Sequence, residues 1–300
     1  MKTKTYLFAL MTIALTLGSC SDNENGIGGE TSKYITVSTS IGNMTRVATD
    51  EKGGQTFEEG DEISVYAWTG DATVAPETRE RVVNNAINKL TNGSWISNPQ
   101  MLWKNNRDKH YFIGVYPISA ISDLSAGEYT FDVNKQTESD LLVAVNKDGL
   151  SYNVDEQQTV PLTFTHVMAK LVVNLTYKNQ WGGIPTVEKV VVGNAAKEAT
   201  INYLTKVVTP STTAKEDFSL PEITENTKYV SVIIPQEDVK QLTIVIGGKN
   251  FVYDNGTPFK LESGKITTVN LEVGRDEIKL GDVKITDWEN GSTFSGEALN

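Results

Sequence analysis

The sequence has little of what disulfide formation, metal binding or nucleic-acid binding requires. Its 300 residues include one cysteine and two histidines, and 27 lysines and arginines stand against 38 aspartates and glutamates, giving a formal net charge of −11. One cysteine cannot form an internal disulfide, and an acidic chain lacks the clustered cations that bind phosphate. After Leu17, no apolar run approaches the roughly 18 residues that cross a bilayer. We therefore predict no nucleic-acid partner, no cofactor, no metal and no membrane-spanning segment.

Motifs of catalysis are also missing from the sequence. It contains no His-Glu-x-x-His, no Gly-x-Ser-x-Gly, no Walker loop and no dinucleotide glycine fingerprint. His110 and His166 each lie in an alternating, strand-like segment, where a histidine more often has a structural role than a catalytic one. The paired carboxylates of a glycosidase leave no sequence spacing, so that class stays open. We predict that the chain is not an enzyme.

The first residues have the order of a secretory signal. Lys2 and Lys4 precede an apolar stretch, 6–17, and the small residues Gly18 and Ser19 follow it, which predicts a signal peptide over residues 1–19. The tetrapeptide 17–20 resembles a lipobox, in which Cys20 is acylated and becomes the new N-terminus. More than one acyl chain, such as palmitate, is what stable anchoring to an outer membrane requires.

An acidic tether, 20–33, follows the acylated cysteine. Its residues 21–25, Ser-Asp-Asn-Glu-Asn, resemble a signal that sends lipoproteins to the outer face of the outer membrane, and they also suit a plain solvated tether. Removing residues 1–19 deletes two lysines and no acid, so the formal charge moves from −11 to −13. The sequence thus predicts a strongly acidic body tethered at the cell surface.

Period-two alternation dominates the rest of the chain and predicts β-strands. The segment 34–41 places four side chains on one side, namely Ile35, Val37, Thr39 and Ile41. Similar alternation marks 63–68, 110–116, 170–177 and 240–246. Glycine-bearing turns at 247–250 and 263–265 favour hairpins. One segment, 79–90, fits helical spacing better than strand spacing, although it lacks a clear helix cap.

Short strands separated by turn residues indicate an all-β chain of antiparallel sandwiches. About 280 residues suit two such domains, and we place the boundary in the polar stretch 155–158. The predicted domains are an N-terminal β-sandwich, 34–158, and a C-terminal β-sandwich, 159–300. Five tryptophans could stack on sugars or fill the core, and packing is the more common role in a sandwich: Trp68, Trp95, Trp103, Trp181 and Trp288.

Several segments of the chain follow one another in a specific order, namely the lipobox, Met44-Thr45-Arg46-Val47, the stretch 57–66, Trp103, the stretch 110–117, the stretch 162–171, and Ile285-Thr286-Asp287-Trp288. In this order they resemble the fimbrillin-like, Mfa-like subunits of type V pili over nearly the whole chain. The resemblance implies two tandem transthyretin-like β-sandwiches and a lipoprotein that reaches the cell surface. It also implies cleavage by an arginine-specific protease, here between Arg46 and Val47, and replacement of the first strand by a strand of a neighbouring subunit.

The residues around the implied cleavage site fit this scheme. Arg46 follows a predicted strand and precedes a polar, glycine-bearing stretch that a protease can reach, although an ordinary loop arginine remains the alternative. The displaced strand would contain Ile35, Val37, Thr39 and Ile41. The resemblance places the donor strand in the C-terminal segment, 278–300, which could equally be the last strand of its own domain. Its alternation changes register at Gly281-Asp282, which suggests a bulge.

Two functions stay open at this point. The first is a stalk or tip subunit of a fimbria that supports adhesion, with other fimbrial subunits as partners and host or bacterial surfaces as ligands. Before processing, such a subunit would be held to outer-membrane lipid through Cys20. The second is a surface-exposed lipoprotein that binds glycans through its tryptophans.

Overall fold

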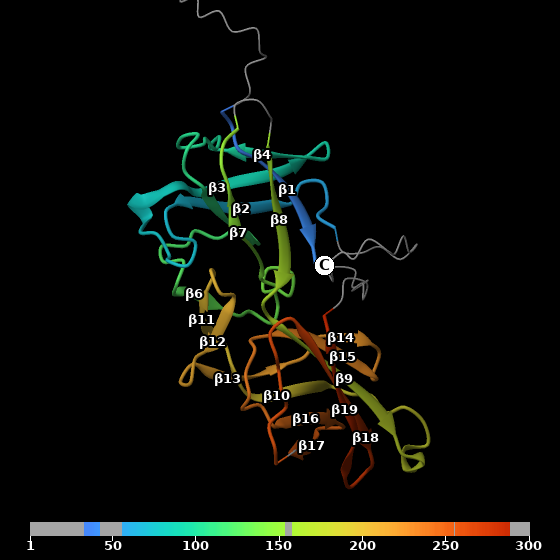
Figure 1. Ribbon diagram of the computed structural model, residues 1–300. Coiled ribbons are helices and arrows are strands. Elements are labelled where there is room, and N and C mark those ends of the chain that lie inside the picture. Colours follow the sequence, from blue (N-terminus) through green and yellow to red (C-terminus); the bar gives the residue numbers. More distant parts are fainter. Residues whose placement is uncertain (1–32, 43–55, 154–157, 255, 289–300) are drawn as a thin grey trace, which may run out of the picture.

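The computed structural model describes residues 33–42, 56–153, 158–254 and 256–288. The regular elements in these ranges are β-strands, apart from two single-turn 3-10 helices, η1 (Thr78–Glu80) and η2 (Asn179–Trp181). Figure 1 shows an elongated molecule, with the earlier strands in its upper part and the later strands in its lower part. The prediction of an all-β fold is confirmed.

A seven-stranded sheet forms the upper part, in the order β1-β8-β7-β5-β2-β3-β4. Its strands are β1 (Thr36–Ile41), β2 (Glu62–Thr69), β3 (Arg81–Thr91), β4 (Ser94–Asn98), β5 (His110–Tyr116), β7 (Leu142–Leu150) and β8 (Thr159–His166). Neighbours pair antiparallel except β1 and β8, which run parallel. The sheet curls so far that its outer strands meet. Trp95 Nε1 on β4 donates a 3.0 Å hydrogen bond to Thr39 Oγ1 on β1.

Three smaller sheets form the lower part and the junction. The five-stranded sheet, β14-β15-β9-β18-β19, contains β9 (Ala169–Tyr177), β14 (Glu222–Thr224), β15 (Lys228–Ile233), β18 (Lys265–Val273) and β19 (Ile278–Asp287). The four-stranded sheet, β13-β10-β16-β17, contains β10 (Lys189–Ala196), β13 (Lys215–Ser219), β16 (Gln241–Ile246) and β17 (Lys249–Asp254). The three-stranded sheet, β12-β11-β6, contains β6 (Gly127–Thr130), β11 (Glu198–Asn202) and β12 (Val207–Pro210).

The central strand β2 is buried on both faces of the seven-stranded sheet, from Ile63 to Trp68, and Ser64 is its one polar residue in that run. Tyr66 and Trp68 belong to a large core that continues through the junction into the lower sheets. Val65 and Ala67, which point the other way, belong to a second core enclosed by the curled sheet beneath β1. Successive side chains of a strand point to opposite faces, so a strand buried on both faces needs apolar residues at every position.

The chain leaves the seven-stranded sheet later than the sequence suggested. The polar stretch 155–158 precedes β8, yet β8 pairs with both β1 and β7 and therefore belongs to the upper sheet. The change of sheet falls at Val167 and Met168, two buried residues between β8 and β9. In addition, β6 pairs with β11, so a segment from the first half of the sequence completes a sheet of the second half. The polar stretch 155–158 is therefore not the point at which the chain passes from the upper sheet to the lower ones.

The helix that the spacing of 79–90 favoured is not present, because most of this segment forms strand β3. The pairing of β3 with β2 shifts register twice, and Asn85 adopts a φ of 54° within it. An extra residue at each bulge moves the following apolar side chains to the other face of the strand. The interrupted alternation then resembles a helical stripe in the sequence.

Of the two predicted hairpins, one is present. β16 and β17 pair antiparallel around Gly247 and Gly248, as expected. The turn at 263–265 does not join a hairpin, because β18 pairs with β9 in parallel and with β19. A parallel partner distant in sequence leaves no local turn signal.

We expect Gly114→Ala to lower the free energy of unfolding by about 1–3 kcal/mol, the usual cost of overpacking a core. A Cβ at Gly114 would lie 2.6 Å from Phe164 Cζ, which is closer than real contacts allow. Urea denaturation measures the loss. Adding Phe164→Leu, which removes Cζ, should recover part of it, whereas simple additivity of the two losses would show that this contact is not the cause.

Candidate functional site

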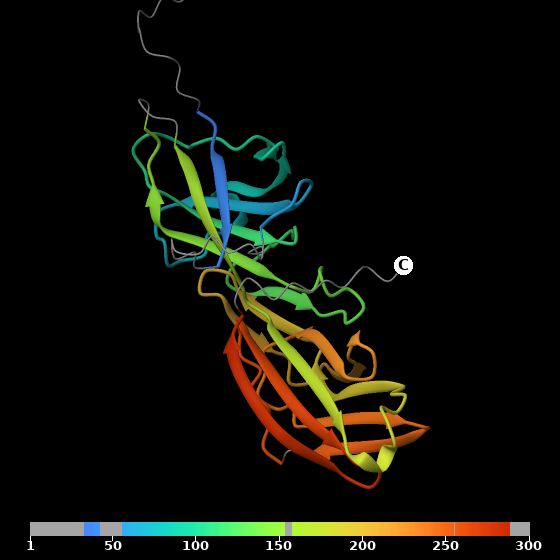
Figure 2. The same cartoon turned by 90° about the vertical axis from the view of Figure 1, so that its right-hand side faces the viewer.

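The first strand, β1, is the outermost strand of its sheet and pairs within that sheet with β8 alone. The pairing runs from Thr36 opposite Thr159 to Ile41 opposite Phe164. Figure 2 shows β1 in blue lying beside the yellow-green β8 along the upper part of the molecule. A strand at the edge of a sheet can be exchanged without separating the remaining strands from one another.

The side chains of β1 alternate between the core and solvent. Ile35, Val37 and Ile41 are buried, with exposed fractions of 2%, 6% and 8%. Thr39 points the same way and accepts the hydrogen bond from Trp95. These side chains close the second core, whose other buried members include Phe112, Leu162 and Phe164. Removing β1 would therefore open an apolar groove along β8.

The backbone of β8 also depends on β1. Gly42 N donates a 2.7 Å hydrogen bond to Phe164 O, so the backbone groups of Phe164 face β1. In a strand, the N–H and C=O groups of alternate residues point the same way, so Val160 and Leu162 face β1 as well. Pro161, which has no N–H, faces β7, where Asn146 Nδ2 donates to its carbonyl oxygen. The proline therefore does not interrupt the ladder to β1.

The N-terminal end of β1 is held on its other side too. Ile35 N donates to Met101 O at 2.9 Å, and Trp103 N donates to Lys33 O at 3.1 Å. Between them Tyr34 forms a single antiparallel bridge with Leu102. The strand thus has full pairing on one side and a short clasp on the other, and both must break if it leaves.

Three residues of the implied processing scheme, Cys20, Arg46 and Val47, lie outside the described residues. So do the signal peptide, 1–19, and most of the tether, 20–33. The described chain ends after β1 at Gly42 and resumes at Thr56. Acylation, cleavage and displacement of β1 stay predictions.

The C-terminal strand β19 forms the outer edge of the five-stranded sheet and pairs with β18. The register shifts at Gly281, since Asn270 is opposite Asp282 and Leu271 is opposite Leu280. The bulge that the alternation suggested is present. Three apolar side chains of β19 are each 38% exposed, namely Leu280, Val283 and Ile285. This edge strand therefore contributes little to the core, in contrast to β1.

Just after β19, Trp288 lies in a cluster that the sequence analysis did not find. Its ring stacks on His166 with 3.9 Å between ring centroids and an interplanar angle of 6°. His166 Nδ1 lies 2.8 Å from Asp140 Oδ1, and Lys170 Nζ lies 4.7 Å from the centroid of a Trp288 ring. His166, Lys170 and Trp288 are buried. The segments 165–170 and 287–288 both belong to stretches that resemble the family. Nothing in the sequence predicts that these two segments contact each other.

Burial changes the charge equilibrium of Lys170. Lys170 is 2% exposed, and removal of its ammonium group from water lowers the pKa of Lys170 to about 8. Asp140 opposes this shift, while Lys228 adds to it. A buried cation near an aromatic ring face recovers part of its lost hydration through the cation–π interaction.

His110, the other histidine, is a satisfied core residue. Its Nε2 accepts a 3.0 Å hydrogen bond from Lys104 N, and its Nδ1 lies 3.1 Å from Asp108 O. Burial lowers the pKa of His110, which favours the neutral ring. Trp103 packs against it edge-on. This arrangement accounts for the histidine without a catalytic role.

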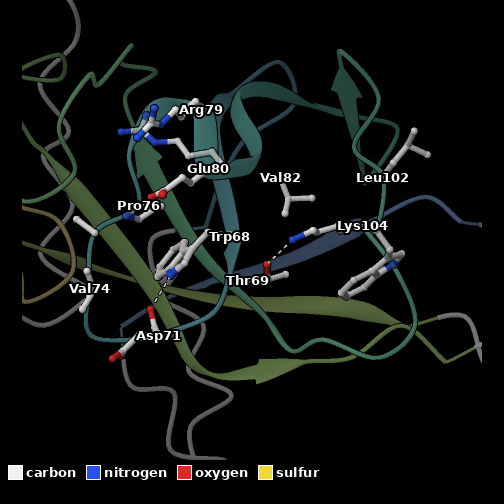
Figure 3. Close-up of a pocket in the computed structure, with 13 residues that line it drawn as sticks. Trp68, Thr69, Asp71, Val74, Pro76, Arg79, Glu80, Val82, Leu102 and Lys104 are labelled. Atoms are coloured by element: carbon white, nitrogen blue, oxygen red, sulfur yellow. Dashed lines mark hydrogen bonds between the residues drawn. The ribbon is translucent and has the colours of Figure 1, made fainter.

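An open hollow beside β2 and β3 contains two of the tryptophans considered for sugar stacking (Figure 3). Trp68 is 2% exposed and donates its indole N–H to Asp71 O, and Trp103 is also buried. The exposed apolar residues at this hollow are Val74 and Leu102. A sugar ring stacks on an exposed aromatic face, which Trp68 and Trp103 do not provide.

No helix in the described ranges has the length and apolarity to cross a membrane. Among the same residues, no group of three or more histidines, cysteines or acids is placed to hold a metal ion.

Solved structures similar to this one include cell adhesion and fimbrial proteins of Bacteroides. A candidate cell adhesion protein from Bacteroides uniformis is 19% identical, with a TM-score of 0.64, covering 85% of this chain and 98% of that one. A candidate cell adhesion protein from Bacteroides ovatus is 18% identical, with a TM-score of 0.61 and the same coverages. A fimbrial protein from Bacteroides vulgatus is 13% identical, with a TM-score of 0.52, covering 84% of this chain and 99% of that one.

The family comparison is more direct than these distant structures. Residues 45–288 match the fimbrillin-like family, and the chain belongs to that family. The match begins after β1 and ends at Trp288. No curated protein matches the sequence.

We expect the buried charge of Lys170 to make stability depend on pH in the alkaline range. The folded pKa, about 8, lies below the usual value of 10.5, so the unfolded chain binds the proton more tightly and stability rises as pH increases between these values. Between pH 7.5 and 9.5 the gain should be ~2 kcal/mol at most. Chemical denaturation of the wild type and of Lys170→Met at both pH values measures it. Equal pH dependence of the two proteins would contradict the prediction.

Proposed function

We propose that this protein is a structural subunit, in the stalk or at the tip, of a type V-like fimbria that supports adhesion. Membership of the fimbrillin-like family supports the fimbrial role. The single observation that carries the assembly mechanism is the outer position of β1, whose side chains nonetheless close a core. In this proposal the subunit reaches the outer membrane as a lipoprotein acylated at Cys20, and cleavage between Arg46 and Val47 releases the tether together with β1.

The energetics of the groove explain why a vacated subunit would take up another strand. Loss of β1 would expose Leu162, Phe164 and their neighbours in the second core to water. It would also leave backbone groups of Val160, Leu162 and Phe164 without their ladder partners, at ~1–3 kcal/mol for each group that stays buried. A whole domain is stable by only about 5–15 kcal/mol. An extended segment from a neighbouring subunit restores both kinds of contact, which is β-augmentation.

The segment supplied by the neighbour is the C-terminal one, 278–300. Its described part is β19, an edge strand whose apolar residues Leu280, Val283 and Ile285 are only partly covered on their own subunit. Leaving its sheet would uncover fewer buried side chains than the loss of β1 would, since none of residues 278–287 is buried. The bulge at Gly281 must straighten, or stay outside the groove, for continuous alternation.

Glycan binding by a surface lipoprotein is the alternative function. Of the five tryptophans considered for it, Trp68 and Trp103 are buried, and Trp68 donates its N–H to Asp71 O within its own subunit. These observations favour core packing for both rings. The fimbrial role is therefore the function that the fold supports best.

Treatment of the purified lipoprotein with an arginine-specific protease should create a new N-terminus at Val47, followed by oligomers that survive heating in detergent. N-terminal sequencing and gel electrophoresis measure the two steps. Arg46→Ala should block both, while Arg107→Ala, which removes a surface arginine on the 104–109 turn, should block neither. Oligomers formed by Arg46→Ala, or cleaved protein that stays monomeric, would contradict the mechanism.

A synthetic peptide of residues 33–42 should bind the cleaved subunit and prevent its polymerisation, because it restores the side chains and ladder of β1. Fluorescence anisotropy and the oligomer distribution measure these effects. A peptide with Val37→Asp is the matched control, since it places a charge in the apolar groove and should bind at least about tenfold more weakly. Equal binding of both peptides would show that the groove does not select its occupant.

A further inference from the structure

The C-terminal strand has one side-chain anchor. Among residues 278–288, all of them described, Trp288 is the only buried one, and the rest are half-buried or exposed. Its ring is 8% exposed, whereas Leu280 and Ile285 are each 38% exposed. Ile278, at the start of β19, is half-buried against the large core, and the ion pair of Lys265 with Asp287 is exposed. The hold on this strand is therefore concentrated at its last described residue.

The surroundings of Trp288 come from the junction between the upper and lower parts. His166 ends β8 in the seven-stranded sheet, and Lys170 lies at the start of β9 in the five-stranded sheet. Asp140, from the segment before β7, contacts the far side of this cluster through His166 Nδ1. The backbone contributes as well, because Trp288 N donates to Gly264 O at 3.0 Å, and Gly264 N donates to Met168 O at 2.8 Å.

We propose that Trp288, His166, Lys170 and Asp140 form a latch that holds β19 on its own subunit and must open before that strand can leave. An edge strand opens locally by breaking only its own contacts, so the buried ring of Trp288 adds to the free energy that the ladder with β18 already supplies. The stacked imidazole fixes the indole, and the carboxylate of Asp140 orients the imidazole. The consequence of the latch for assembly rests on the proposed fimbrial function, whereas the latch itself does not depend on that function.

The latch also lies next to the groove of β1. The end of β1 contacts Phe164, since Gly42 N donates to Phe164 O, and the latch residue His166 follows two positions later on β8. The residue of β8 that binds the end of β1, Phe164, and the residue that stacks on Trp288, His166, therefore lie on the same short segment of β8. Figure 1 shows the upper end of β19 reaching this junction.

Amide hydrogen exchange of the intact, uncleaved chain tests the latch. Trp288→Ala should raise exchange in 278–287 at least about tenfold, while β10 and β16 in the neighbouring sheet keep their protection. His166→Ala should act in the same direction. Asp287→Ala, which removes the exposed pair with Lys265 next to the latch, is the matched control and should change exchange less than about threefold. Trp288→Phe should stay close to the wild type because it keeps a stacked ring.

Three outcomes would overturn the latch: unchanged exchange of β19 in Trp288→Ala, an equal effect of Asp287→Ala, or a uniform rise across every sheet, which would mean general loosening. The assembly role is read separately, as the rate of oligomer formation after cleavage. Trp288→Ala should polymerise faster than the wild type. If exchange of β19 rises but neither protein forms oligomers, the latch stands and strand exchange fails.

Discussion

The parallel pairing of β1 with β8 is the contact on which the organisation of the upper part depends. It joins segments about 120 residues apart and brings the sheet around until Trp95 on β4 meets Thr39 on β1. The second core is enclosed only because this closure takes place. A parallel partner needs no local turn, so nothing in the sequence close to β1 holds it in place except side chains and backbone hydrogen bonds. Many individually weak interactions together hold β1 on β8, and no covalent bond or short turn joins the two strands.

Strand propensity was the part of the fold that the sequence revealed well. The alternation in 110–116 coincides with β5, and that in 170–177 falls within β9, because each strand pairs without a register shift or with one near its end. β3 has a helix-like spacing for the opposite reason, since two register shifts against β2 move its apolar residues between faces. Which strands pair with one another is harder to predict than the strands themselves. The parallel pairing of β18 with β9 depends on the whole fold and leaves no turn signal in the sequence.

The candidate site was predictable to the same extent as its strands. Inward positions of β1 follow from a period of two, and the bulge of β19 follows from the change of alternation at Gly281. The cluster at Trp288 does not follow from any pattern. A lone histidine, a lysine in a strand and an acid before a strand are ordinary surface residues until the junction between the sheets buries them together. Burial of Lys170 in particular runs against the usual exposure of lysine.

β1 and β19, each at the edge of its sheet, differ in how many side chains they bury. β1 and Ile35 directly before it bury three aliphatic side chains, worth about 1.5–3 kcal/mol each, and β1 satisfies buried backbone groups of β8. A subunit that lost it would forfeit a large share of a typical domain stability, so the vacancy favours being filled. β19 pairs with β18 along its length, but its side chains are half-buried or exposed, and the buried ring beside it is that of Trp288. In the proposed mechanism, the strand whose loss uncovers a core marks the acceptor, and the strand with few buried side chains is the donor. His166 and Phe164 lie two positions apart on β8, so the groove of β1 and the ring that stacks on Trp288 belong to the same short segment of that strand.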